Sequence, residues 1–262
     1  MVSDLTEVIR GEAVTVGFGK KDVLRNVNLS VEEDELVGVV GPNGSGKTTL
    51  IRAIAGFLPY KGTIYYDGVP TNKLKRRDIA KFLSVVPQEP PVSTLTVMDF
   101  VLLGRYPYLS RWKDEGPADV SAATEALREL GALHLKDRQI NTLSGGELQR
   151  VMLARGVVQG QRVILMDEPT SHLDLKAQQE IMELARSLAK KRSIIATFHD
   201  LTLAGQYSDR IVVLREGMML AQGKPRDVLT SDMISRVYGV KVIIEYEPVF
   251  HVIPVFSDSS GQ

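Results

Sequence analysis

The 262-residue chain has an ordinary globular composition, with 44% hydrophobic and 24% charged residues, which suits one large α/β domain or a core with a smaller appended part. Its 32 Lys and Arg balance its 32 Asp and Glu, so bulk charge favours neither a nucleic-acid partner nor an anionic membrane surface. The lack of cysteine excludes disulfides and thiolate metal sites, and no apolar run is long enough to span a bilayer. We therefore expect an intracellular chain that reaches a membrane only through a partner.

Two short alternating segments near the N-terminus, around Ala13–Phe18 and Val27–Val31, predict antiparallel strands. Phe18 ends the first of them. An aromatic side chain there either stacks on an adenine ring or is a half-buried strand residue, and the pattern alone favours the second interpretation.

The stretch Gly41-Pro42-Asn43-Gly44-Ser45-Gly46-Lys47-Thr48 lies between the apolar run Leu36–Val40 and a helix-like segment that begins with Thr49. A strand, a glycine-rich loop of this form and a helix are together typical of a nucleotide phosphate site, whereas an ordinary glycine-rich turn needs no such flanks. Backbone N–H groups of the loop surround the anion, and the helix N-terminus adds partial positive charge. We expect Lys47 to reach the β- and γ-phosphates and Thr48 to offer its hydroxyl to Mg²⁺. The predicted binding residues are Gly41, Asn43, Gly44, Ser45, Gly46, Lys47, Thr48 and Thr49.

Two further strands are predicted before residue 88. The helix after the phosphate loop is expected to end near Gly56, and a short strand over Gly62–Tyr66 follows it. A buried strand over Phe82–Val86 then ends at Pro87-Gln88.

Residues 89 to about 142 lose the strand signals and carry helical periodicity instead. Pro117 opens a helix that stops at Gly131, with an apolar face predicted to consist of Val120, Ala123, Leu127 and Leu130. We therefore predict a helical insertion, 89–142, within an α/β chain.

Leu143-Ser144-Gly145-Gly146-Glu147 starts the next helix. Ser144 and Glu147 have the spacing of a capping box, so a purely structural role is one interpretation. A capping box does not require Gly145-Gly146, however, and each glycine in a helix costs about 1 kcal/mol relative to alanine. The glycines are explained if another body approaches the backbone amides closely.

Val163–Met166 is an uninterrupted apolar run, which predicts a strand buried on both faces. It delivers Asp167 and Glu168 to its C-terminal end, where ligands bind in open α/β sheets. Beside a phosphate loop, one carboxylate can hold Mg²⁺ while the next positions the attacking water.

Ser171–Asp174 leads into a helix that Asp174 caps, with an inner face predicted to consist of Ala177, Ile181, Leu184 and Leu188. Ser193–Phe198 is the next predicted core strand, and His199 stands at its end. A lone histidine is usually structural, but this position allows a hydrogen bond to a γ-phosphate or to the attacking water.

The C-terminal part begins with a predicted hairpin over 211–223, followed by a helix that Thr230 or Ser231 caps. Residues 240–256 alternate as two strands, and 257–262 are expected to fray. We predict a C-terminal helix and strand extension over 224–262.

Together, these motifs resemble those of the nucleotide-binding subunit of an ATP-binding cassette (ABC) transporter over nearly the whole chain, as a single ABC ATPase domain of residues 1–262. Gly41–Thr48 resembles the Walker A loop, Val163–Glu168 the Walker B strand, and Leu143–Glu147 the family signature LSGGE. The Q-loop glutamine, the switch histidine, the adenine-stacking aromatic and the D-loop correspond to Gln88, His199, Phe18 and Ser171–Asp174, respectively. The resemblance implies a P-loop NTPase core, a mostly parallel sheet flanked by helices, with an N-terminal antiparallel β subdomain and an inserted α-helical subdomain.

The resemblance also implies that two subunits dimerise head to tail with two ATP molecules between them. Each ATP would lie between the Walker A loop of one subunit and Ser144, Gly145 and Gly146 of the other, with Asp174 at the same interface. It further implies that Glu168 is the catalytic base and that His199 senses the γ-phosphate. The residues implied to serve Mg²⁺ are Thr48, Gln88 and Asp167.

A finer resemblance, to the importer branch for iron-siderophores, haem and cobalamin, is carried by Gly104–Tyr108, Thr170–Asp174, His199-Asp200-Leu201 and Val237–Val240. Relatives in that branch also carry molybdate and tungstate, so the cargo stays open. The resemblance implies a separate transmembrane permease that docks on the helical insertion and an external substrate-binding protein that acts indirectly. The chain would then lie in the cytoplasm, on the inner face of the cell membrane.

Two other functions were weighed against this one. A soluble ABC ATPase acting on DNA repair or ribosomes is disfavoured by the single nucleotide domain, the balanced charge and the lack of a long coiled-coil insertion. A P-loop kinase for a small molecule is opposed by the signature and the switch histidine.

Overall fold

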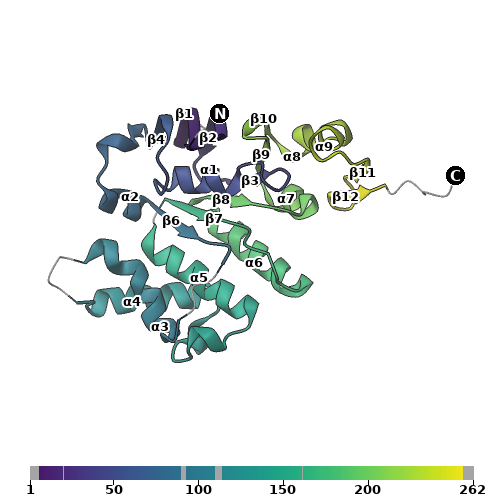
Figure 1. Cartoon of the computed structure of the whole chain (residues 1–262). Coiled ribbons are helices and arrows are strands. Elements are labelled where there is room, and N and C mark those ends of the chain that lie inside the picture. Colours follow the sequence, from purple (N-terminus) through teal and green to yellow (C-terminus); the bar gives the residue numbers. More distant parts are fainter. Residues whose placement is uncertain (1–5, 20, 90–92, 110–113, 161, 256–262) are drawn as a thin grey trace, which may run out of the picture.

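The computed structural model describes residues 6–19, 21–89, 93–109, 114–160 and 162–255. Within them, a six-stranded sheet in the order β10-β9-β3-β8-β7-β6 forms the centre (Figure 1). The neighbours from β9 to β6 are parallel, and only β10 runs antiparallel at the edge. Its strands are β3 (Leu36–Val40), β6 (Leu83–Val86), β7 (Val163–Met166), β8 (Ser193–Thr197), β9 (Arg210–Arg215) and β10 (Met218–Gly223).

An antiparallel sheet in the order β2-β1-β4-β5 lies on one side of this core (Figure 1). A separate two-stranded sheet near the C-terminus pairs β11 with β12 in antiparallel fashion. The strands of these two sheets are β1 (Glu7–Phe18), β2 (Lys21–Glu32), β4 (Lys61–Tyr66), β5 (Val69–Pro70), β11 (Val242–Glu245) and β12 (His251–Pro254).

Helices that include α5 and α6 cover the other side of the central sheet, and the inserted helices α3 and α4 pack on α5. The helices are α1 (Lys47–Ile54), α2 (Arg76–Phe82), α3 (Val97–Leu102), α4 (Pro117–Glu129), α5 (Gly145–Gln159), α6 (Leu175–Leu188), α7 (Leu201–Tyr207), α8 (Pro225–Val228) and α9 (Ser231–Tyr238). The expected fold class, including the antiparallel subdomain and the inserted helices, is confirmed. The predicted boundaries 89–142 and 224–262 stay predictions.

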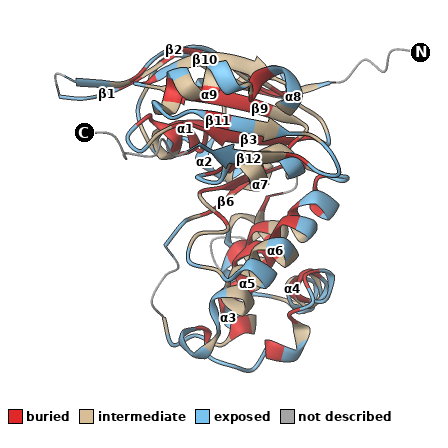
Figure 2. Cartoon of the chain, turned by 90° about the vertical axis from the view of Figure 1, so that its right-hand side faces the viewer, coloured by how far each residue is buried: buried red, intermediate tan, exposed pale blue. Residues whose placement is uncertain are grey.

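Alternate residues of the central strands face two hydrophobic cores. On β3, Leu36 and Val40 join the core that contains the inserted helices, whereas Val37 and Val39 join the core beneath the antiparallel sheet. Strand β7 divides in the same way, which explains why its apolar run is uninterrupted. Figure 2 shows the buried residues along these strands and on the facing sides of α3, α4 and α5. No helix in the described ranges is both long and apolar enough to cross a membrane.

The N-terminal strands are longer than predicted, at 12 residues each. Ala13 and Asn26 adopt left-handed backbone conformations, with φ of 52° and 50°, and the pairing of β1 with β2 shifts register near them. Such bulges break the alternation from which strands are recognised, so the pattern showed only parts of each strand.

Two predicted helix faces need correction. Val120 is 42% exposed because it lies at the edge of the buried stripe of α4, which consists of Ala123, Ala126, Leu127 and Leu130. On α6, Ala177 and Leu184 are only partly buried, because the inner face is centred instead on Ile181, Met182, Ala185 and Leu188.

Candidate active site

The phosphate loop joins the end of β3 to the start of α1 with a backbone that requires glycine. Gly41, Gly44 and Gly46 have φ of 155°, 76° and 106°, values that residues with a side chain rarely adopt. A Cβ at Gly41 would lie 2.1 Å from the carbonyl oxygen of Leu214, whereas one at Gly44 would meet open space. The first glycine therefore permits close packing beneath the loop, and the second leaves its outer side clear.

The turn between β9 and β10 supports this loop from behind. Gly217 N donates to the carbonyl oxygen of Ser45 at 3.0 Å, and Arg25 N donates to the carbonyl oxygen of Gly217 at 2.8 Å. The loop is thus tied to two other parts of the chain without using its own outward N–H groups.

Lys47 lies against the loop, only 6% exposed. Its Nζ donates to the carbonyl oxygens of Gly41 at 2.8 Å and Pro42 at 3.4 Å. Burial lowers the pKa of Lys47, and the nearby Asp167 and Glu168 carboxylates act in the opposite direction. The two carboxylates therefore favour the charged form of the lysine that an anionic ligand would meet.

Asp167 and Thr48 form the second group of the site. The Asp167 side chain is buried, and its Oδ1 accepts from Thr48 Oγ1 at 3.1 Å and from Thr197 Oγ1 at 2.8 Å. The carboxylate is therefore fixed between the N-terminus of α1 and the end of β8.

Glu168 is the residue on which the other elements converge. Its backbone has φ of 51°, and its N–H donates to Thr197 Oγ1 at 2.8 Å. Its carboxylate accepts from Gln88 Nε2 at 2.6 Å and from Ser171 Oγ at 3.0 Å, and it contacts His199 Nε2. The structure thus brings together the Q-loop, Walker B, D-loop and switch positions.

The signature residues lie elsewhere on the same chain. Ser144 and Gly145 are exposed and, with Asp174 and His172, line a hollow of about 280 Å³. Among the described residues, no hydrogen bond or ion pair joins Ser144–Gly146 to the phosphate loop.

The capping box predicted at the signature is present. Glu147 N donates to Ser144 Oγ at 3.4 Å, and Ser144 N donates to the Glu147 carboxylate at 2.8 Å. The hydrogen bonds that Ser144 N and Ser144 Oγ donate to the Glu147 carboxylate lower the pKa of Glu147. Gly145 and Gly146 also have an intramolecular reason, because added Cβ atoms would lie 3.0 Å from Leu173 and 3.1 Å from Ala177. The two glycines therefore allow α5 to pack closely against the start of α6, whether or not they also lie at an interface.

Phe18 and Asp174 occupy the predicted elements. Phe18 ends β1 with its side chain 54% exposed, so it is free to stack on a planar ring rather than being a half-buried strand residue. Asp174 caps α6 by accepting from Ala177 N at 2.8 Å.

The donor set suits a nucleotide with Mg²⁺. Thr48 and Asp167 offer hard oxygen ligands beside the phosphate loop, as Mg²⁺ prefers. Ser45 Oγ is buried and has no hydrogen-bond partner among the described residues, so the loop keeps a free donor for an oxyanion. Among those residues, no group of three or more His, Asp or Glu side chains is arranged to hold a metal ion by itself.

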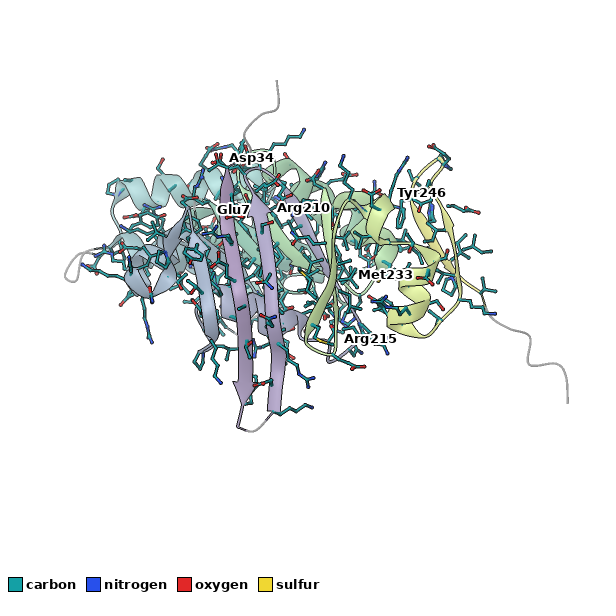
Figure 3. All side chains as sticks on the ribbon, turned by 90° about the horizontal axis from the view of Figure 1, so that it is seen from above. Glu7, Asp34, Arg210, Arg215, Met233 and Tyr246 are labelled. Atoms are coloured by element: carbon teal, nitrogen blue, oxygen red, sulfur yellow. The ribbon has the colours of Figure 1, made fainter. Side chains whose placement is uncertain are left out.

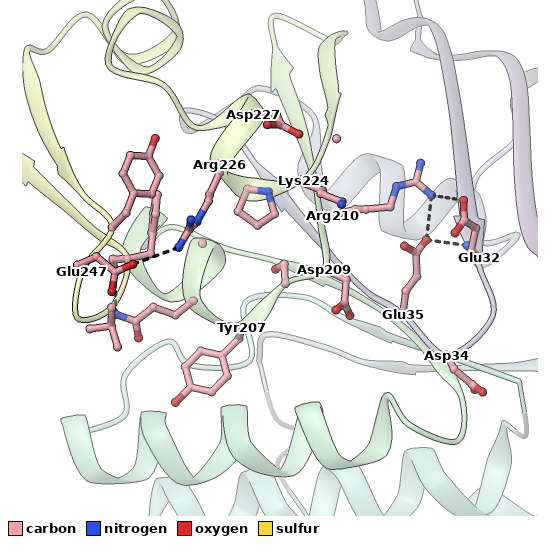
Figure 4. Close-up of a pocket in the computed structure, with 18 of the residues that line it drawn as sticks. Glu32, Asp34, Glu35, Tyr207, Asp209, Arg210, Lys224, Arg226, Asp227 and Glu247 are labelled. Carbon is pink, nitrogen blue, oxygen red and sulfur yellow. Dashed lines mark hydrogen bonds and ion pairs between the residues drawn. The ribbon is translucent and has the colours of Figure 1, made fainter. Parts of the chain in front are cut away.

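A large cavity in the described ranges lies apart from this site. It measures about 1150 Å³ and lies between the turn from β2 to β3, the end of α7, α8 and the loop of the C-terminal hairpin (Figure 4). Arg210 pairs there with Glu32 and Glu35, each at 3.2 Å, and burial raises the pKa of Glu35 to about 7. Because Glu35 precedes β3 whereas the phosphate loop follows it, the two sites are at opposite ends of that strand.

Comparison with known proteins decides the family. The sequence model described as "ABC transporter" matches residues 24–171. The chain belongs to the ABC transporter family. As a member, it is an ATP-binding subunit that hydrolyses ATP to drive transport.

Two relatives that match over most of their length and one solved structure support the same family. The chain is 40% identical over 249 residues to the hemin import ATP-binding protein HmuV of Myxococcus xanthus (strain DK1622), covering 91% of this chain and 92% of the relative. It is 34% identical over 248 residues to the ferric enterobactin transport ATP-binding protein FepC of Escherichia coli (strain K12), with coverage of 92% and 90%. A dimeric structure of the ATP-binding cassette MJ0796, in a post-hydrolysis state bound to ADP and Pi, matches with a TM-score of 0.71 and 30% identity, covering 83% of this chain and 99% of that one.

Sequence reasoning missed Thr197 and gave Ser171 no role of its own. Thr197 is fully buried and joins Asp167 to the backbone of Glu168. Thr197 could have been found as the one hydroxyl-bearing residue in the otherwise apolar run 194–198. The pairing of β7 with β8 brings this hydroxyl to Asp167 and Glu168.

The Thr197 hydroxyl provides a first prediction. Thr197→Val keeps the side-chain shape but leaves Asp167 Oδ1 and Glu168 N each without one partner, which costs about 1–3 kcal/mol of unfolding free energy. We expect the kcat for ATP hydrolysis to fall about tenfold, because the two carboxylates lose their common support. Steady-state ATPase assays and chemical unfolding measure the two effects.

Ser193→Ala is the matched control, because Ser193 Oγ donates to the Glu32 carbonyl oxygen at 2.7 Å from the other end of β8. It should cost similar stability and leave kcat within about twofold. An equal loss of kcat in both variants would show that Thr197 serves the fold alone.

Proposed function

We propose that this chain is the MgATP-hydrolysing motor subunit of an importer for iron-siderophores, haem or cobalamin. The convergence of Gln88, Ser171 and His199 on the Glu168 carboxylate carries the proposal, because it places polar groups from three loops around one potential base. The carboxylate lies at the C-terminal edge of the parallel sheet, where the phosphate loop also begins.

In this proposal Glu168 is the catalytic base. The hydrogen bonds from Gln88 and Ser171 hold its carboxylate in one orientation, so an oxygen can accept the proton of a water that attacks the γ-phosphate. His199, whose side chain is 49% exposed, can contact both Glu168 and the γ-phosphate. Its position couples the presence of that phosphate to the base.

Thr48, Asp167 and Gln88 would hold Mg²⁺. The ion, when bound, neutralises charge on the β- and γ-phosphate oxygens. Thr197 keeps the Asp167 carboxylate turned toward Thr48, and Lys47 supplies a second positive charge from the opposite side of the loop.

The nucleotide would contact the loop residues and one aromatic ring. The phosphates would be bound by the N–H groups and side chains of the loop, and the adenine ring would stack on Phe18. The predicted loop contacts are Gly41, Asn43, Gly44, Ser45, Gly46, Lys47, Thr48 and Thr49.

A second copy of the chain would complete each site. Ser144, Gly145 and Gly146 stand at the N-terminus of α5, a 15-residue helix whose N-terminal end favours anions. In the described ranges they form no hydrogen bond or ion pair with the phosphate loop of their own chain. In a head-to-tail dimer they would close on the ATP held by the partner, with Asp174 beside them. The similar MJ0796 cassette is dimeric with ADP and Pi bound, which supports dimerisation of this chain.

The transmembrane part and the cargo are proposed from relatives. HmuV and FepC are named for hemin import and ferric enterobactin transport, which supports an importer of iron complexes or related cofactors. The chain would lie on the cytoplasmic face of the membrane, with its inserted helices against the permease, and an external binding protein would deliver the cargo. We propose no nucleic-acid partner.

Replacing the proposed base tests the mechanism. Glu168→Gln keeps the hydrogen-bond geometry but removes proton acceptance, so ATP binding should persist while kcat falls at least a hundredfold. The ATP-bound dimer should then accumulate, which size-exclusion chromatography with light scattering detects. Glu183→Gln, an exposed change on α6, is the control and should behave as the parent chain. Hydrolysis by Glu168→Gln at the parental rate would contradict the assignment.

Co-purification tests the transport role. Expressed at native level and extracted in mild detergent, the tagged chain should bring down a transmembrane permease. The external binding protein that serves this permease should bind an iron-siderophore, haem or cobalamin, and uptake of that compound should require Lys47. A binding protein that takes molybdate or tungstate would contradict the cargo, and capture of ribosomes or DNA without a permease would contradict the importer.

A further inference from the structure

The C-terminal hairpin lies on α7, the short helix that follows His199. Asp200 caps this helix by accepting from Thr202 N at 2.7 Å and from Leu203 N at 3.1 Å. Because Asp200 alone separates His199 from the helix, a shift or rotation of α7 changes where the imidazole lies. The position of α7 therefore determines where His199 lies.

Three contacts fix α7 to the loop and first residues of β12. Val252 N donates to Thr202 Oγ1 at 3.1 Å, and Gln206 Nε2 donates to the carbonyl oxygen of Phe250 at 2.8 Å. The ring of the buried Phe250 lies on Gly205, where an added Cβ would be only 2.2 Å from two ring carbons. The ring thus occupies the space that a side chain at position 205 would need.

The rest of the hairpin also contacts Phe250 and packs on α9. β11 packs on α9, and the Tyr246 ring meets the Phe250 ring at 5.7 Å between centroids with a tilt of 58°. Figure 3 shows Tyr246 and Met233 within this extension, beside the β9–β10 hairpin that carries Arg215. On its other side the loop borders the cavity of about 1150 Å³ (Figure 4). Phe250 therefore packs on α7 beside this cavity, which residues 205–207 of α7 also line.

We propose that Phe250 is a positioning residue for ATP hydrolysis: by packing on Gly205 it holds α7 so that the His199 imidazole meets the Glu168 carboxylate. The inference rests on the proposed function, since it requires His199 and Glu168 to act together. Gln88 and Ser171 hold Glu168 independently of α7. Loss of Phe250 therefore misplaces His199 alone, and its effect on kcat is bounded by that of removing His199.

Steady-state ATPase kinetics of the full chain test the proposal. Phe250→Ala should lower kcat at least fivefold and leave the KM for ATP within about twofold, because the phosphate-loop contacts do not involve the hairpin. Val249→Ala removes an exposed neighbour in the same loop and should change neither value. A folded Phe250→Ala chain with parental kcat would overturn the proposal.

Coupling to His199 separates positioning from a general loss of structure. In a His199→Ala background, Phe250→Ala should cause no further fall in kcat beyond about twofold. Losses that multiply would show that Phe250 acts by another route. If His199→Ala itself keeps the parental kcat, the proposed role of His199 fails first and the positioning role fails with it.

Gly205→Ala tests the contact between Phe250 and Gly205 by changing the residue on α7. The substitution raises helix propensity, so the chain should fold, yet the new Cβ displaces the Phe250 ring and should lower kcat as Phe250→Ala does. The double variant Gly205→Ala with Phe250→Ala should be no slower than Phe250→Ala alone. A Gly205→Ala chain with parental kcat would contradict the proposal even if Phe250→Ala proved unstable.

Discussion

The parallel register of β3, β8, β7 and β6 is the constraint on which the site depends. Parallel strands end at the same edge of a sheet, and pairs such as Met166 with Ala196 bring the residues that follow them together. The phosphate loop follows β3, the two carboxylates follow β7, and Gln88 and His199 follow β6 and β8. Sequence segments more than a hundred residues apart thereby meet around one carboxylate.

One threonine hydroxyl converts this register into a defined geometry. Thr197 accepts from Glu168 N and donates to Asp167 Oδ1, so one hydroxyl holds the backbone of Glu168 and the carboxylate of Asp167. The left-handed backbone at Glu168, with φ of 51°, is unfavourable for a residue with a side chain and persists because its surroundings fix it. The result is a division of labour between a carboxylate beside Thr48 and one beside His199.

Much of this arrangement could be predicted from the sequence, because its motifs are short and contiguous. The phosphate loop, the buried strand before Asp167 and the capping box at Ser144 are each defined by neighbouring residues. What could not be predicted depends on contacts between distant segments: the Thr197 bridge, the packing of Phe250 on Gly205, and the large cavity beside it. The left-handed residues inside β1 and β2 likewise interrupt the pattern by which strands are recognised.

In the proposed head-to-tail dimer, each copy would carry two halves of different sites, because Ser144 and Gly145 are exposed and form no hydrogen bond or ion pair with the phosphate loop of their own chain in the described ranges. ATP binding and assembly would then be one process. The family supplies the ATPase activity, and the exposed signature is the reason we propose that a second copy completes each site.

Mixing two inactive variants tests that claim most directly. Lys47→Ala disables the phosphate loop, and Ser144→Arg blocks the signature, so neither chain alone should hydrolyse ATP. In a head-to-tail dimer of the two, one site retains both an intact loop and an intact signature. An equimolar mixture should therefore recover about a quarter of the parental ATPase rate, since about half of the dimers are mixed and each has one intact site. A mixture as inactive as its components would contradict a site shared between two chains.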